Sequence, residues 1–177
     1  MNSLFVLTLS AADRPGLVKE LAEIVASHDG NWEVSRMAHL GGRFVGLLQV
    51  SLPTANIAAL RADLEALEGL SFTFSETAPA SGAAAQRLRV RILGNDRPGI
   101  VHAIFRAFAE AGANVEELHT TTRSAPETGM QIFEASAWVA GIDEATQEAV
   151  CERIEAIAHD IMVDVWLESD DPRSTDT

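Results

Sequence analysis

The stretch Asp13-Arg14-Pro15-Gly16 recurs as Asp96-Arg97-Pro98-Gly99, 83 residues further along the chain. Each copy follows an apolar run with the character of a strand and precedes a run with helical periodicity. In both copies an asparagine, Asn31 or Asn114, comes 18 residues after the aspartate. A repeat with matched internal spacing indicates two copies of one small module.

The composition of the chain limits the classes of protein to which it can belong. It has 177 residues, of which 47% are hydrophobic, enough for packed cores. With 13 Lys and Arg against 26 Asp and Glu, the formal net charge is −13 at pH 7. This charge repels phosphate backbones, so we expect no direct nucleic-acid binding. The single cysteine, Cys151, excludes an internal disulfide and a cysteine-based metal site, which suits a reducing cytoplasm.

The apolar run Leu4–Leu9 raises the alternative of a targeting signal. No positively charged residue precedes it, it is too short to span a bilayer, and a similar run recurs at Leu88–Leu93. A strand explains both copies whereas a signal explains one. We therefore expect a cytoplasmic protein without a membrane segment.

The order of the expected elements is the same in both halves. The first half has expected strands at Leu4–Ser10, Asn31–Leu40, Arg43–Leu52 and Leu70–Glu76, with helices at Pro15–His28 and Ala55–Glu68. The second half has expected strands at Arg87–Leu93, Asn114–Thr122, Met130–Val139 and Ile161–Leu167, with helices at Pro98–Ala111 and Asp143–His159. The order β-α-β-β-α-β predicts the α+β class and two ferredoxin-like modules, each an antiparallel sheet with both helices on one face.

This order also predicts the boundaries of the modules. The first module covers residues 1–76 and the second covers residues 87–167. Residues 77–86 are rich in Ala, Ser and Gly and are expected to be a linker. Residues 168–177 are polar and acidic with almost nothing to bury, so we expect a disordered tail.

The Asp-Arg-Pro-Gly turn has the features of an anion site built from backbone. Proline at the first helical position gives up an amide that would have no partner within the helix, and glycine lets a ligand approach closely. The free amides that follow favour a carboxylate at the helix N-terminus. We expect the strand ends to bring Asp96 and Asn114 toward this point, where their oxygens would hold an amine. The structural alternative is that the aspartate simply caps the helix, and that one pocket or neither binds.

The pattern of strand, Asp-Arg-Pro-Gly, helix, glycine, asparagine and strand resembles the ACT domain, a regulatory module that commonly binds amino acids. The resemblance covers about residues 3–76 and 87–167. Two tandem ACT domains with little else resemble the glycine cleavage system transcriptional repressor family. That resemblance implies a regulator that senses a small amino acid, glycine or serine, and contacts a protein partner, a transcription activator, rather than DNA.

The resemblance also implies ligand-binding residues by position. In the second half these are Asn95, Asp96, Arg97, Pro98, Gly99, Ile100 and Asn114. In the first half they are Asp13, Arg14, Pro15, Gly16, Leu17 and Asn31. The halves differ where Ala12 stands in the place of Asn95, so the second pocket is the better candidate, or the two sites take different ligands.

One face of the first sheet is expected to contact another chain or the second module. Val6, Val45 and Leu47 fall on the side opposite the core, and an apolar open face is usually covered. We therefore expect a homo-oligomer or an interdomain contact at this face, and the alternative is cover by the linker.

Charged residues on the expected strands allow two interpretations, a structural role or contact with a partner. Glu33 and Glu116 occupy matching positions of a strand at the sheet edge, where they either blunt the edge or contact a partner. The arginines at 87, 89 and 91 could bind an acidic partner, but we expect them to pair with Glu134 across the sheet.

The sequence offers no cluster of residues suited to catalysis, a metal or a cofactor. The histidines at 28, 39, 102, 119 and 159 do not form a metal-binding or general-base pattern, and no phosphate-binding or dinucleotide motif is present. We therefore expect a protein that is not an enzyme and holds no metal or cofactor. The alternatives are a freestanding regulatory subunit of an amino-acid metabolic enzyme and, from another class, a small enzyme.

Overall fold

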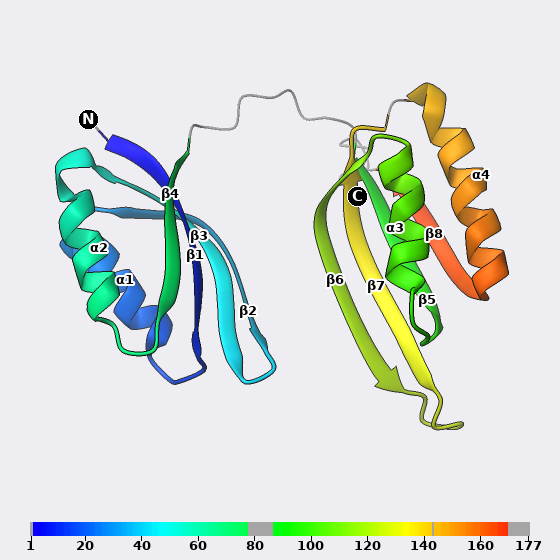
Figure 1. Ribbon diagram of the computed structural model, residues 1–177, viewed down its shortest axis with the longest axis horizontal. Coiled ribbons are helices and arrows are strands. Elements are labelled where there is room, and N and C mark those ends of the chain that lie inside the picture. Colours follow the sequence, from blue (N-terminus) through cyan, green and yellow to red (C-terminus); the bar gives the residue numbers. More distant parts are fainter. Residues whose placement is uncertain (1, 78–86, 143, 170–177) are drawn as a thin grey trace, which may run out of the picture. The chain divides into compact units, whose positions relative to one another are not determined.

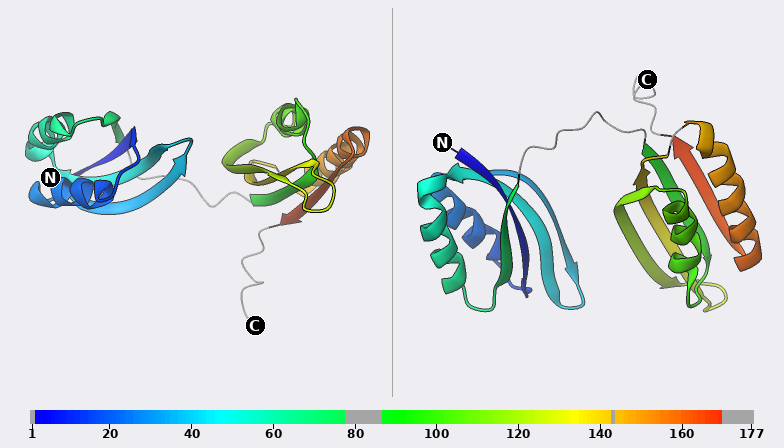
Figure 2. Two further views of the ribbon diagram at one scale, coloured as in Figure 1. Left: turned by 90° about the horizontal axis from the view of Figure 1, so that it is seen from below. Right: turned by 45° about the horizontal axis from the view of Figure 1, so that its top comes forward.

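Figure 1 presents a computed structural model of the chain, which describes residues 2–77, 87–142 and 144–169. The chain divides into two compact units, Met1–Ser81 and Gly82–Thr177. Each unit has one four-stranded antiparallel sheet with two α-helices packed on one face (Figures 1 and 2).

The described elements follow the β-α-β-β-α-β order twice. The first unit consists of β1 (Asn2–Ala12), α1 (Leu17–Ser27), β2 (Asn31–Leu40), β3 (Arg43–Pro53), a short 3-10 helix (Thr54–Asn56), α2 (Ile57–Ala66) and β4 (Ser71–Thr77). The second unit consists of β5 (Arg87–Asn95), α3 (Ile100–Glu110), β6 (Asn114–Ser124), β7 (Gln131–Ala140), α4 (Glu144–Ile161) and β8 (Val163–Ser169). The strand orders are β2-β3-β1-β4 and β6-β7-β5-β8, so the predicted ferredoxin-like α+β fold is confirmed.

Alternating residues of the central strands build a separate core in each unit. On β1 the buried set is Phe5, Leu7 and Leu9, and on β5 it is Leu88, Val90 and Ile92. These side chains face the helices, because successive residues of a strand point to opposite faces of the sheet. The helices complete the two cores with apolar side chains at helical spacing, among them Leu21, Val25, Ile104 and Phe108.

The ends of the expected modules lie partly within strands. Thr77, expected as the first linker residue, ends β4. Glu168 and Ser169, expected in the tail, pair with Arg89 and Leu88 as the end of β8. The remaining linker and tail positions, 78–86 and 170–177, lie outside the described residues.

The open faces of the two sheets, turned away from the helices, differ in chemistry. In the first unit the open face carries exposed aliphatic side chains, with Val34 55% and Leu47 49% exposed. In the second unit it carries arginine and tryptophan instead: the Arg87 guanidinium lies 4.7 Å from the centre of the Trp138 ring, a cation–π contact.

The expected pairing of the three arginines with Glu134 is wrong. Glu134 instead accepts a hydrogen bond from Arg123, with 2.7 Å between the Arg123 Nε and the Glu134 Oε1. Arg87 approaches Glu116, with 2.9 Å between its Nε and the Glu116 Oε2. Glu116 can reach it because a bulge in β6, between Val115 and Glu117, inserts this residue into the strand.

Candidate functional site

The Pro-Gly pairs form the turns that lead into α1 and α3. Gly16 has φ +88° and ψ −7°, and Gly99 has φ +93° and ψ −1°. These are the angles of the third residue of a type II turn, a position that favours glycine with proline before it. The helices begin one residue later, at Leu17 and Ile100. The expectation that proline occupies the first helical position is therefore wrong, because the glycine is the N-cap.

Backbone hydrogen bonds hold each turn against the neighbouring β-hairpin. The amide of Asp13 donates to the carbonyl of Gly42 at 3.3 Å, and the amide of Asp96 donates to the carbonyl of Gln131 at 2.8 Å. Neither helix has a side-chain cap at its N-terminus. The aspartates therefore do not act as helix caps, and the first amides of the helices keep their donors free of a side-chain partner.

In the first unit, a carboxylate of the chain itself lies at the turn. Arg14 donates hydrogen bonds to both carboxylate oxygens of Glu20, with 2.6 Å between its Nη1 and Oε1. This bidentate contact holds the pKa of Glu20 below its usual range. A Cβ built on Gly16 would lie 3.9 Å from the same Oε1, so the carboxylate lies beside the turn glycine.

In the part of the chain that the structure describes, the second unit has no such carboxylate at its turn. Ala103 stands 83 residues after Glu20 and provides no charge. Among the described residues Arg97 has no hydrogen bond or ion pair, and a Cβ on Gly99 would meet nothing within 4 Å. Aligning the two halves of the sequence reveals this difference between Glu20 and Ala103, although neither residue is among the expected site residues.

The two asparagines lie far from the turn of their own unit. Asn114 pairs with Ala140, which pairs on its other side with Arg87, the first residue of β5. The turn follows the last residue of that nine-residue strand, so at about 3.3 Å per residue roughly 26 Å separates the two ends. Asn31 lies likewise at the end of the sheet away from Asp13. The expectation that the strand ends of one module bring Asp96 and Asn114 together is therefore wrong.

The other candidate residues do not form a reactive site. His28 and Asp63 contact each other at 2.7 Å and join α1 to α2. Burial raises the pKa of the Cys151 thiol, and the negative charges of Glu155 and Glu148 raise it further. A raised pKa disfavours the reactive thiolate. In the described residues no group of three or more His, Cys, Asp or Glu side chains is placed to hold a metal ion. In the same residues no helix is both long and apolar enough to cross a bilayer.

Comparison with family models covers both units. Residues 3–74 and residues 88–159 each match a model described as ACT domain. The chain belongs to the ACT-domain family. ACT domains are regulatory modules, and the presence of two of them in tandem supports a regulatory role for this chain.

Two solved structures resemble the chain over nearly its whole length. An unknown protein from Galdieria sulphuraria is 28% identical, with a TM-score of 0.83 over 96% of this chain and 99% of that one. A proposed glycine cleavage system transcriptional repressor is 21% identical, with a TM-score of 0.68 over 96% of this chain and 98% of that one. At this identity the second likeness establishes the fold. A search of curated protein sequences finds no relative of this chain.

Proposed function

We propose that this protein is an amino-acid-responsive regulator without catalytic activity, and that a small amino acid binds at the turn of its second ACT domain. The observation that carries the proposal is the contrast between the two turns. Arg14 and Gly16 already have a carboxylate of the chain beside them, whereas Arg97 and Gly99 have none among the described residues. The ligand carboxylate would take the place that Glu20 has in the first domain, with the amides of Gly99 and Ile100 and the guanidinium of Arg97 as donors.

For its amine, the ligand would need a further acceptor from another copy of this domain. Asn114 lies at the far end of its own sheet, while β6 is an edge strand with exposed side chains along its whole length. If two such edges pair in antiparallel fashion, the start of one strand comes beside the end of the other. The turn lies near that end, because Asp96 bonds to Gln131, which pairs with the last residue of β6. Asn114 of one domain and Asp96 of another would then share one ligand.

We further propose that the regulated process is transcription of a glycine cleavage system. The likeness to a proposed repressor of that system supports this assignment, and glycine or serine is the corresponding ligand. The net charge of −13 favours contact with a protein, such as a transcription activator, over contact with DNA. If the partner-binding state of the regulator differs in its affinity for the ligand, the two equilibria are coupled reciprocally.

A thermal-shift panel of the twenty amino acids tests the ligand site. At about 100 times its dissociation constant, a ligand should stabilise the folded protein by about 2.7 kcal/mol. We expect a shift with glycine or serine that is lost in Asp96→Ala and retained in Asp13→Ala, the matched variant of the first domain. The absence of a shift with any amino acid, or its loss in Asp13→Ala alone, would contradict the proposed site.

Capture of partners on the immobilised protein tests the regulatory role separately. We expect a transcription factor to bind, with an affinity that depends on the ligand found in the panel. Copurification of an amino-acid metabolic enzyme instead would favour the alternative of a freestanding regulatory subunit.

A further inference from the structure

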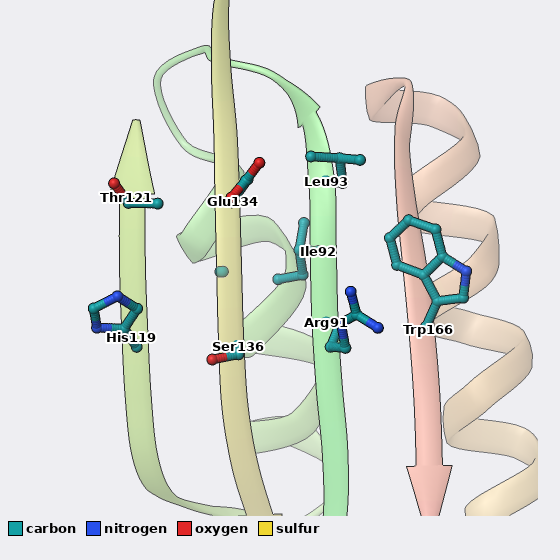
Figure 3. A pocket seen from close by; sticks show the side chains of 9 residues that line it. Arg91, Ile92, Leu93, His119, Thr121, Glu134, Ser136 and Trp166 are labelled. Carbon is teal, nitrogen blue, oxygen red and sulfur yellow. The ribbon is translucent and has the colours of Figure 1, made fainter. Parts of the chain in front are cut away.

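The open face of the second sheet contains a hollow that the turn residues do not form. One row of side chains crosses all four strands in register: His119 on β6, Ser136 on β7, Arg91 on β5 and Trp166 on β8. Figure 3 shows these side chains with the helices behind the sheet. Because Ser136 is small and its neighbours in the row are large, a cavity of about 320 Å³ opens above it. This volume lies in the range of small-molecule sites, about 300–1,000 Å³.

The charges in this hollow favour an anion. The Arg91 guanidinium lies 5.7 Å from the centre of the Trp166 ring and has no hydrogen bond or ion pair with any described residue. Glu134 lines the same hollow, but its carboxylate is already neutralised by Arg123. Among the described residues, Arg91 is therefore left without a counter-charge, and a single uncompensated cation suits a monoanion better than a dianion such as phosphate.

The walls of the hollow favour a flat apolar group beside that anion. Trp166 is 43% exposed, so part of its indole ring is open to a ligand, and Leu93 lines the hollow from the same face. Flat rings stack well on tryptophan, and a guanidinium binds a carboxylate through two parallel hydrogen bonds.

We propose that this hollow binds a planar carboxylate, an aromatic or heteroaromatic acid in its monoanionic form. The carboxylate contacts Arg91, the Ser136 hydroxyl and the His119 ring supply further hydrogen bonds, and the ring of the ligand lies against Trp166. The proposal does not rest on the amino-acid site, because none of its residues belongs to the turn.

The first domain provides an internal comparison for this site. The corresponding row there is Arg36, Leu47, Thr8 and Thr73, which has no tryptophan and no arginine on the central strand. The proposed site therefore belongs to the second domain.

A fluorescence titration of the full chain with benzoate tests this site. In a chain carrying Trp32→Phe and Trp138→Phe, Trp166 is the sole tryptophan and reports on the hollow. We expect a saturable change in its emission with benzoate, and none with benzamide, which has the same size but no charge. Arg91→Gln should weaken benzoate binding about tenfold or more, since it removes a charge-assisted bidentate contact.

Control measurements decide between this site and general effects of charge. Arg61→Gln removes one positive charge from an exposed helix position of the first domain and should leave benzoate binding unchanged. Circular dichroism checks the fold of each variant, and Arg91→Lys, which keeps the charge without the bidentate geometry, replaces Arg91→Gln if that variant does not fold. Four outcomes would each overturn the proposal. They are equal responses to benzamide and benzoate, tighter binding of inorganic phosphate than of benzoate, no response to benzoate, and equal binding of benzoate by the Arg91 variant and the wild type.

Discussion

At the scale of single residues, Glu20 determines how the first turn differs from the second. Its carboxylate lies beside Gly16, where the amides at the start of α1 favour negative charge, and Arg14 neutralises it. Both effects favour the charged form of Glu20, and the hydrogen bond from Arg14 is the largest cause of its lowered pKa. The stability of the first domain should therefore depend on pH through this residue.

The substitution Glu20→Gln tests that dependence. Since the pKa of Glu20 is lower in the folded chain than its ordinary value of 4.5, its stabilising contribution is complete above about pH 4.5. The contribution is lost as the pH falls through the lower, folded-state pKa. We expect Glu20→Gln to melt at a lower temperature than the wild type at neutral pH, and the difference to disappear in acid.

Calorimetric melting over a series of pH values measures this difference. Glu23→Gln is the matched control, because Glu23 lies on the same helix in an exposed i,i+4 pair with Lys19, where the contribution to stability is small. A difference between Glu20→Gln and the wild type that stays the same at every pH would contradict the assignment.

The sequence predicted the conformation of the turn only in part. Pro-Gly before a helical run indicates a turn, but it leaves open whether proline starts the helix or precedes it. The structure resolves this through the positive φ of Gly16 and Gly99, which a helical residue does not adopt. The role of Glu20 depends on a side-chain contact with Arg14, six residues earlier and before the start of α1, which a pattern of residue types does not specify.

At the scale of the elements, the packing of β5 against β8 requires glycine at position 94. Gly94 pairs with Val163, and a Cβ built on Gly94 would lie 2.8 Å from the Val163 Cβ. Two carbon atoms in van der Waals contact lie about 3.5–4.0 Å apart, so a side chain at this position forces the strands to move.

We expect Gly94→Ala to destabilise the second domain by about 1–3 kcal/mol, the usual cost of overpacking a core. Val163→Ala shortens the opposing side chain, so the double variant should lose less stability than the sum of the two single variants. Denaturant unfolding of the wild type, both single variants and the double variant measures the coupling. Strict additivity would mean that the two residues do not compete for the same space.

The elements were predictable from local sequence patterns, while the position of each strand in the sheet was not. Alternation and helical periodicity are local signals, and they located every described α-helix and strand to within about two residues. The position of Asn114 depends instead on the strand order β6-β7-β5-β8, in which β5 and β6 run in the same direction. No local pattern carries that information, so the expected meeting of Asn114 with Asp96 in one module failed.

At the scale of the whole molecule, the two ACT domains have separate hydrophobic cores. Leu64 is fully buried in the core of the first domain, and Ile104 is fully buried in that of the second. In the described residues, the two buried clusters have no member in common. We therefore expect a destabilising substitution in one core to lower the stability of the domain that contains it.

Leu64→Ala and Ile104→Ala test this expectation as a matched pair. Each substitution removes a buried aliphatic side chain and should cost about 2–5 kcal/mol. In calorimetry, Leu64→Ala should lower one unfolding transition and Ile104→Ala the other. Equal lowering of a single transition by both variants would mean that the domains unfold as one cooperative unit.

The carboxylate of Glu20 also has a consequence for the stoichiometry of ligand binding. With its first turn occupied by its own side chain, each chain should take up one equivalent of amino acid, although it carries two copies of the turn. If the chains are already associated, the binding isotherm should be hyperbolic, and a sigmoidal isotherm would indicate that ligand binding is coupled to association between chains. Replacing Glu20 by Ala, the residue at the matching position of the second domain, should open the first turn and raise the stoichiometry to two.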